Sequence, residues 1–179
     1  MLANQIGYYS LIIGLLFSFY LCGVSIKDFN NNNKNVNPNI ITLSFLQLIF
    51  VIISFLSLIL SFINSDFSNE TVFNNSHTTK PLFYKISGTW GNHEGSLLLW
   101  LLVLTLFIFL FLIKSREQPK KYRILTLLFQ QLIIIGFFLF VLMTSNPFNY
   151  LFPIPAEGLG LNPILQDPAL AIHPPLLYL

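Results

Sequence analysis

The sequence predicts an all-α integral membrane protein with four complete membrane-spanning helices, the start of a fifth, and its N-terminus on the trans side. Three observations predict this class. Hydrophobic residues make up 54% of the 179 positions and charged residues only 9%, whereas soluble domains carry about 25% charged residues. Four apolar runs have roughly the 20-residue length that crosses a bilayer. The basic residues are concentrated in two short connecting segments, and such segments orient membrane helices.

The four apolar runs define the expected spans. Backbone groups without hydrogen-bond partners are costly in lipid, so an apolar segment of this length crosses the bilayer as a helix. We expect the complete spans at about residues 6–26, 40–63, 96–113 and 124–144. A fifth span begins near Pro174.

The distribution of positive charge predicts the orientation of these spans. Of the nine Lys and Arg residues, all but Lys80 and Lys85 lie within residues 27–39 and 114–123. Cytoplasmic or matrix loops are enriched in Lys and Arg, so the N-terminus and the two long loops face the trans side. The resulting organisation is two helices with an Asn-rich connector (1–63), a trans loop (64–95), two further helices (96–144), and a Pro-rich trans loop leading into the fifth helix (145–179).

The composition excludes several kinds of site. Cys22 stands alone, so the sequence contains neither an internal disulfide nor a Cys-x-x-Cys-His site for covalent haem. Zinc and iron–sulfur spacings are absent, and a net charge of +2 is too small to indicate nucleic acid as a partner. The expected spans carry no central charge, which argues against an ion pathway through this chain alone. Gln130 and Gln131 are expected to hydrogen-bond between helices.

The first informative segment runs from Trp90 to Ser96, immediately before the third span. Its glycines, Gly91 and Gly95, permit tight backbone geometry, and Ser96 could cap the helix that follows. Trp90 suits the membrane interface, where indoles commonly anchor a span. For His93, the residues alone favour a structural hydrogen-bonding role over a ligand role.

The second informative segment ends with His173 and the pair Pro174-Pro175. Prolines suit the first turn of a helix, so we expect His173 on the N-cap side of the fifth span, at the trans interface. A neutral imidazole beside apolar surface can serve as an axial ligand of haem iron. From these residues alone, the favoured alternative is an interfacial histidine that caps a helix or forms a hydrogen bond.

Several uncommon strings in these loops resemble the N-terminal part of the CcmF-type cytochrome c haem lyase. The strings are Trp90-Gly-Asn-His-Glu-Gly-Ser-Leu-Leu-Leu-Trp100, Thr144-Ser-Asn-Pro-Phe148, Leu161-Asn-Pro-Ile-Leu-Gln-Asp-Pro168, His173-Pro-Pro-Leu-Leu-Tyr178, and the approach Pro81-Leu-Phe-Tyr-Lys85. The resemblance extends over essentially the whole chain in spacing. It is specific in the two loops and generic in the spans.

The resemblance implies that the chain handles b-type haem in transit, received from a haem chaperone on the trans side and attached by thioether bonds to apocytochrome c. His173 matches a haem-iron axial ligand, and this match reverses the preference stated above. Trp90 and His93 would belong to the haem-binding site, and no catalytic residue is assigned. The family's tryptophan-rich loop and its other haem ligands are not found in residues 1–179. A remaining lyase subunit or C-terminal portion would supply them, so the chain is not expected to be catalytic alone.

Two other functions stay open from the sequence. One is a structural membrane subunit of a maturation or respiratory complex without haem contact, and the other is a subunit of a haem transporter. The lack of charged or broken spans argues against the transporter. The Asn, Phe and Ile bias favours a mitochondrial inner membrane over a bacterial plasma membrane, and membrane lipid is the expected surrounding in either case.

Overall fold

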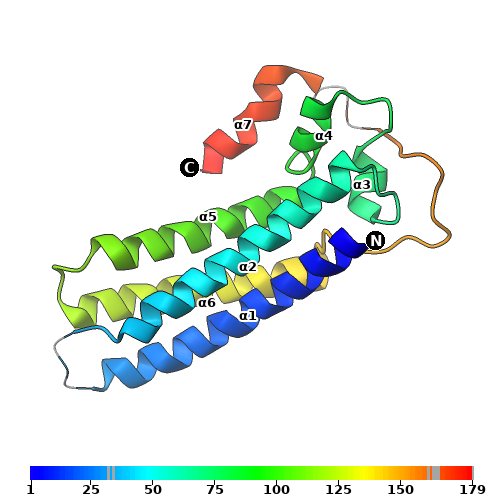
Figure 1. Ribbon diagram of the computed structural model, residues 1–179. Coiled ribbons are helices and arrows are strands. Elements are labelled where there is room, and N and C mark those ends of the chain that lie inside the picture. Colours follow the sequence, from blue (N-terminus) through cyan, green and yellow to red (C-terminus); the bar gives the residue numbers. More distant parts are fainter. Residues whose placement is uncertain (32, 34, 161, 163–165, 179) are drawn as a thin grey trace.

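The computed structural model describes residues 1–31, 33, 35–160, 162 and 166–178, and regular secondary structure in these residues is helical. Four long helices form an elongated bundle (Figure 1): α1 (Leu2–Phe29), α2 (Pro38–Ile63), α5 (His93–Lys114) and α6 (Lys120–Thr144). Three short helices gather at one end of it: α3 (Glu70–Asn75), α4 (Leu82–Gly88) and α7 (Pro168–Tyr178). Each long helix is apolar enough to cross a membrane, which confirms the predicted all-α integral membrane protein.

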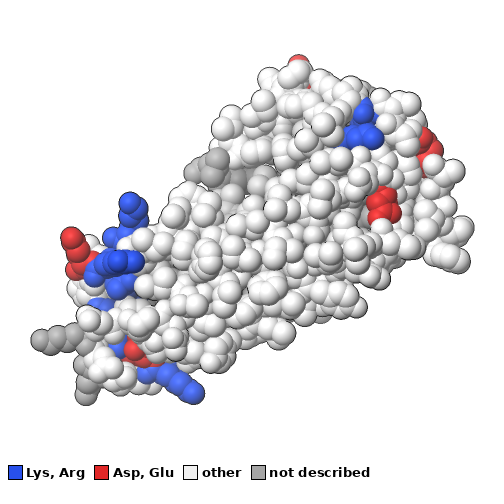
Figure 2. All heavy atoms as spheres, in the orientation of Figure 1, with Lys and Arg blue, Asp and Glu red and all other residues white. Residues whose placement is uncertain are grey.

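The two ends of the bundle differ in charge. The connections from α1 to α2 and from α5 to α6 lie together at one end, here called the basic end, where Lys and Arg side chains cluster (Figure 2). The opposite end, here called the loop end, contains residues 64–92 and the described part of 145–178. Between the two ends, the face shown in Figure 2 is a wide uncharged surface, as lipid-facing helices require.

Apolar contacts hold the bundle together. Helix α1 packs mainly against α2 and α6, and α5 packs mainly against the same two helices. Large side chains fill the interior, among them Leu11, Leu58, Leu101, Ile134 and Phe138. Other large apolar side chains stay exposed along the outside, which is the expected arrangement for a surface in contact with lipid tails.

One polar cluster interrupts this interior. The side chains of Gln47 on α2 and Gln131 on α6 bond reciprocally, with Nε2-to-Oε1 distances of 3.2 and 3.0 Å. Gln47 also donates to the Ser18 hydroxyl of α1 at 2.5 Å. The expected interhelical hydrogen bonding is therefore confirmed for Gln131. For Gln130, the buried Oε1 atom has no partner among the described residues.

A buried ion pair closes the basic end. The Lys120 ammonium lies 2.9 Å from a carboxylate oxygen of Asp28, and the other oxygen of Asp28 accepts the backbone N–H of Asn37 at 3.0 Å. Lys120 also donates to the Asn31 carbonyl at 3.1 Å. These contacts join the end of α1 to the start of α6.

The prediction for the start of the fifth helix was wrong by six residues. Helix α7 begins at Pro168, because the Asp167 carboxylate accepts the backbone N–H groups of Ala169 at 2.8 Å and Leu170 at 3.1 Å. An acidic cap followed by proline is a strong helix start. Pro174 and Pro175 therefore lie inside α7, and His173 lies in its second turn rather than at its N-cap.

Candidate functional site

The sharp turn between α4 and α5 is built by Asn92 and Gly95. The Asn92 side chain accepts the Gly95 N–H at 2.7 Å and donates to the Gly88 carbonyl at 2.7 Å, so it caps α5 and holds the end of α4. A Cβ atom on Gly95 would lie 1.6 Å from the Thr89 carbonyl oxygen. The expectation that Ser96 caps this helix was wrong, because Asn92 occupies that position and the Ser96 hydroxyl donates to the His93 carbonyl at 2.9 Å.

His93 links the start of α5 to the end of α6. Its Nε2 atom lies 3.1 Å from the Ser145 hydroxyl oxygen, and Ser145 is buried. The imidazole is exposed and occupies the first turn of α5. This bond is of the structural kind that the sequence context of His93 favours, and a haem-binding role for His93 stays a prediction.

Trp90 connects the two informative segments. Its indole N–H donates to the backbone carbonyl of Ala171 at 2.7 Å, across 81 positions of sequence. Ala171 is buried, only 4% exposed, and α7 packs against α4 and α5. The segment that begins with Trp90 therefore lies directly against the helix that carries His173.

His173 lies on the side of α7 away from this contact. Two helical positions correspond to a rotation of about 200°, so the buried Ala171 and the exposed His173 point in nearly opposite directions. Residues three or four positions apart share a helix face, and the neighbours of His173 on that face are Leu170, Leu176 and Leu177, all exposed. The imidazole thus stands on an apolar surface. Such surroundings fit a porphyrin, which needs a nitrogen donor and apolar contacts.

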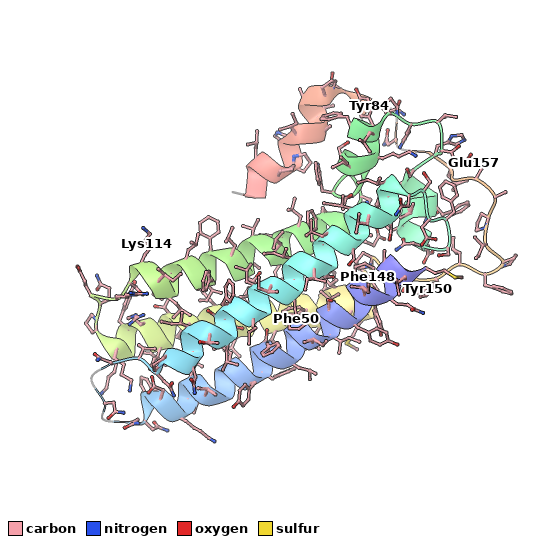
Figure 3. The ribbon with its side chains drawn as sticks, viewed as in Figure 1. Phe50, Tyr84, Lys114, Phe148, Tyr150 and Glu157 are labelled. Atoms are coloured by element: carbon pink, nitrogen blue, oxygen red, sulfur yellow. The ribbon has the colours of Figure 1, made fainter. Side chains whose placement is uncertain are left out.

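A buried amide pair anchors the segment that follows α6. Asn69 donates to the Pro147 carbonyl at 2.8 Å and to the Asn4 side-chain oxygen at 2.5 Å, and Asn4 donates to the Phe148 carbonyl at 3.2 Å. The ring of Phe148 packs over Gly7 of α1, and Figure 3 shows it directed into the bundle. The sequence analysis missed Asn4 and Asn69, although a polar residue at the start of a span, as Asn4 is, is a usable signal.

Glu157 fixes the far part of the same loop. Its carboxylate accepts the Thr78 hydroxyl at 2.5 Å and the backbone N–H groups of Thr78 and Gly158 at 3.0 Å each. These bonds, chiefly the one from the Thr78 hydroxyl, lower the pKa of Glu157 to about 2. The bonds to Thr78 hold this part of the loop, where Glu157 is labelled in Figure 3, against the segment that contains Thr78. Residues 161 and 163–165 of the Leu161–Pro168 string lie outside the described residues.

The residues around these contacts differ in what they could bind. A cluster of three or more His, Cys, Asp or Glu residues suited to a metal ion is not found in the described part of the chain. His77 bonds to the Thr79 hydroxyl at 2.9 Å and approaches Glu157 at 3.9 Å. His173 differs in having no hydrogen bond to any described residue. Its imidazole nitrogens are therefore not engaged by the part of the chain that the structure describes.

Comparisons with known proteins identify the family of the chain. A family model described as cytochrome C assembly protein matches residues 90–179. The cytochrome c-type biogenesis protein CycK of Rhizobium meliloti is 41% identical over 175 residues, which is 98% of this chain and 26% of the relative. The cytochrome c-type biogenesis protein CcmF of Escherichia coli is 45% identical over 127 residues, covering 70% of this chain and 20% of the relative.

A solved structure titled cytochrome c heme lyase CcmF has the same fold. It superimposes with a TM-score of 0.75 at 22% identity, covering 98% of this chain and 27% of that structure. The chain therefore spans about a quarter of the length of the relatives that it matches.

Proposed function

Because the chain belongs to the cytochrome c assembly protein family, as the N-terminal portion of a CcmF-type cytochrome c biogenesis protein, we propose that it forms part of a cytochrome c haem lyase. In this proposal it binds haem at the loop end of the bundle. It helps the covalent attachment of that haem to apocytochrome c. The loop end is proposed to face the trans side, because the basic end carries the short Lys- and Arg-rich connections.

The observation that carries the proposal is the hydrogen bond from Trp90 to the Ala171 carbonyl. It joins the two segments in which the family resemblance is specific, and it leaves the opposite side of α7 exposed. On that side His173 offers an imidazole nitrogen to the haem iron, with Leu170, Leu176 and Leu177 as apolar neighbours. His93 supports the site through Ser145 and is not needed as a ligand in this arrangement.

In this role the chain positions its substrate and leaves the chemistry to the reacting groups. The haem, as substrate, supplies two vinyl groups, and each thioether forms when a cysteine S–H of the apocytochrome adds across a vinyl C=C bond without a leaving group. Holding the haem at the loop end converts a bimolecular encounter into a positioned one. Exposed apolar side chains on α7 help to keep the porphyrin out of bulk water.

The proposed partners follow from the same reaction. A haem chaperone delivers the substrate, apocytochrome c accepts it, and a remaining lyase subunit or C-terminal portion supplies a tryptophan-rich loop and further ligands. For the compartment, the residue bias favours the mitochondrial inner membrane, whereas the bacterial sources of the relatives named above favour a bacterial plasma membrane. We therefore propose the bacterial plasma membrane first, and membrane fractionation of the source cells tests this choice.

The central test replaces His173 in the protein purified from membranes with its native partners. We expect His173→Ala to lose haem absorbance while the protein still inserts into the membrane at the normal level. His173→Gly should regain the absorbance when imidazole is added, because the small molecule can replace the missing side chain. His77→Ala is the matched control, since His77 lies at the same end of the bundle and already has protein partners.

Normal haem retention and a normal yield of cytochrome c in His173→Ala would overturn the ligand role. Equal haem loss in His77→Ala would show that the loop end responds to any histidine removal, and would also overturn it.

A further inference from the structure

Two interior carbonyls of helix α7 lack the donor that an α-helix normally provides four residues later. In an α-helix the N–H of residue i donates to the carbonyl of residue i−4, and proline has no N–H. Pro174 and Pro175 therefore leave the carbonyls of Leu170 and Ala171 without their helical donors. A buried carbonyl without a donor is strongly disfavoured, and Ala171 is buried.

The indole of Trp90 takes the place of one missing donor. Its N–H lies 2.7 Å from the Ala171 carbonyl oxygen, the acceptor that a residue other than proline at position 175 would use. Resting on the proposed function above, we propose that Trp90 is a positioning residue for His173. Its indole N–H substitutes for the backbone donor that Pro175 lacks, and thereby fixes how α7 presents the imidazole to haem.

The dependence of α7 on this bond follows from its length and its neighbours. An isolated helix of 11 residues is only marginally stable in water, and two prolines remove two of its internal bonds. Its main packing contacts in the structure are with α4 and α5, which flank Trp90. A side chain that bonds the helix at the buried Ala171 therefore sets both the position of α7 and its rotation about its own axis.

The proline pair also makes the bond specific. If residue 175 had a backbone N–H, that group would donate to the Ala171 carbonyl within the helix. The carbonyl would then no longer need the Trp90 indole as its donor. Pro174 frees the carbonyl of Leu170, not that of Ala171, and Leu170 is an exposed residue. Trp90 and Pro175 are thus coupled to each other, whereas Trp90 and Pro174 are not.

The experiment measures haem retained by the complete protein, purified with its partners, in four variants. Trp90→Phe keeps an aromatic ring but removes the donor, and we expect roughly two- to tenfold weaker haem retention, as for the loss of one net hydrogen bond. Adding Pro175→Ala to Trp90→Phe should restore most of the retention, because the new amide satisfies the Ala171 carbonyl. Adding Pro174→Ala instead should restore none. Pro175→Ala alone should retain haem normally.

The electron paramagnetic resonance spectrum of the ferric haem gives a second readout. Its g-values depend on ligand orientation, so we expect them to shift in Trp90→Phe and to return with Pro175→Ala. If Trp90→Phe does not accumulate in membranes, a benzothienylalanine at position 90 keeps the ring volume without the N–H and carries the same expectations. The Pro175→Ala and Pro174→Ala additions then apply to that variant.

Failure of this inference can be told apart from failure of the proposed function. Normal haem retention in His173→Ala would remove the proposed function itself. Haem loss in His173→Ala, combined with unchanged retention in Trp90→Phe or with equal rescue by the two proline variants, would overturn the positioning role alone.

Discussion

Between α1, α2, α5 and α6 the interior contacts are mainly apolar, with one polar cluster around Gln47 and Gln131. At the loop end, by contrast, side chains bond directly to backbone carbonyls of distant segments, as Asn69 does to Pro147 and Trp90 does to Ala171. Apolar surfaces of similar volume can replace one another. A side-chain donor that bonds one particular carbonyl cannot be replaced by another residue of similar volume. This difference explains why the family resemblance is specific in the loops and generic in the spans.

The largest effect should come from the turn between α4 and α5. Gly95→Ala would place a methyl group against the Thr89 backbone, where neither partner can rotate away. We expect a loss of about 3 kcal/mol or more in the free energy of unfolding, at the upper end of overpacking effects. Unfolding of the detergent-solubilised protein, followed by circular dichroism, measures this loss.

Gly136→Ala is the matched control, because a Cβ atom there meets nothing within 4 Å. Alanine is favoured over glycine in a helix interior by about 0.5–1 kcal/mol, so this variant should be unchanged or slightly more stable. Equal losses in the two variants would contradict the distinction between the loop end and the bundle.

A smaller but still large effect should come from the buried amide of Asn69. Asn69→Ala removes the donor to Pro147 and the acceptor for the Val72 N–H, and both partners stay buried. Unsatisfied buried groups cost about 1–3 kcal/mol each, so we expect a loss of about 2–4 kcal/mol in the same unfolding measurement. Local loosening of residues 146–150 should accompany it in hydrogen exchange.

Asn75→Ala tests whether the effect depends on the long-range partners. Asn75 makes a local bond to the Thr71 carbonyl within α3, so its loss should reduce stability by less than about 1 kcal/mol. A loss for Asn69→Ala no greater than that for Asn75→Ala would mean that the carbonyl-directed bonds are not what holds the loop end.

The same comparison explains how much of the molecule the sequence could predict. The four membrane spans could be predicted from the length and hydrophobicity of their segments, because insertion into lipid depends mainly on these two properties. The start of α7 was not predicted correctly, because the prediction rested on the double proline, whereas the Asp167-Pro168 pair begins the helix. In a similar way, Ser96 was the expected cap of α5, but Asn92 occupies that position, and asparagine ranks among the strongest N-cap residues.

The long-range bonds of the site lay beyond sequence reasoning for a different reason. Trp90 and Ala171 are 81 positions apart, and Asn4 and Phe148 are 144 positions apart. A backbone carbonyl has no residue-specific signature, so no local pattern points to it as a partner. The sequence did identify two informative segments, which contain Trp90, His93 and His173. The structure places all three residues at one end of the bundle.

The smallest effect should come from the polar cluster inside the bundle. Gln47→Leu and Gln131→Leu each leave one buried amide without its partner, and we expect losses of about 1 kcal/mol. The double variant should lose less than the sum, with a coupling near the 0.6 kcal/mol typical of such pairs in membranes. Gln130→Leu is the control from the adjacent position, since its side-chain oxygen is already unpaired among the described residues, and it should be neutral or stabilising. If Gln47→Leu or Gln131→Leu cost as much as Asn69→Ala while Gln130→Leu stayed neutral, the bundle would depend on specific polar bonds as the loop end does, and the contrast between the two regions would fail. Simple addition of the two losses in the double variant would mean that Gln47 and Gln131 are not coupled.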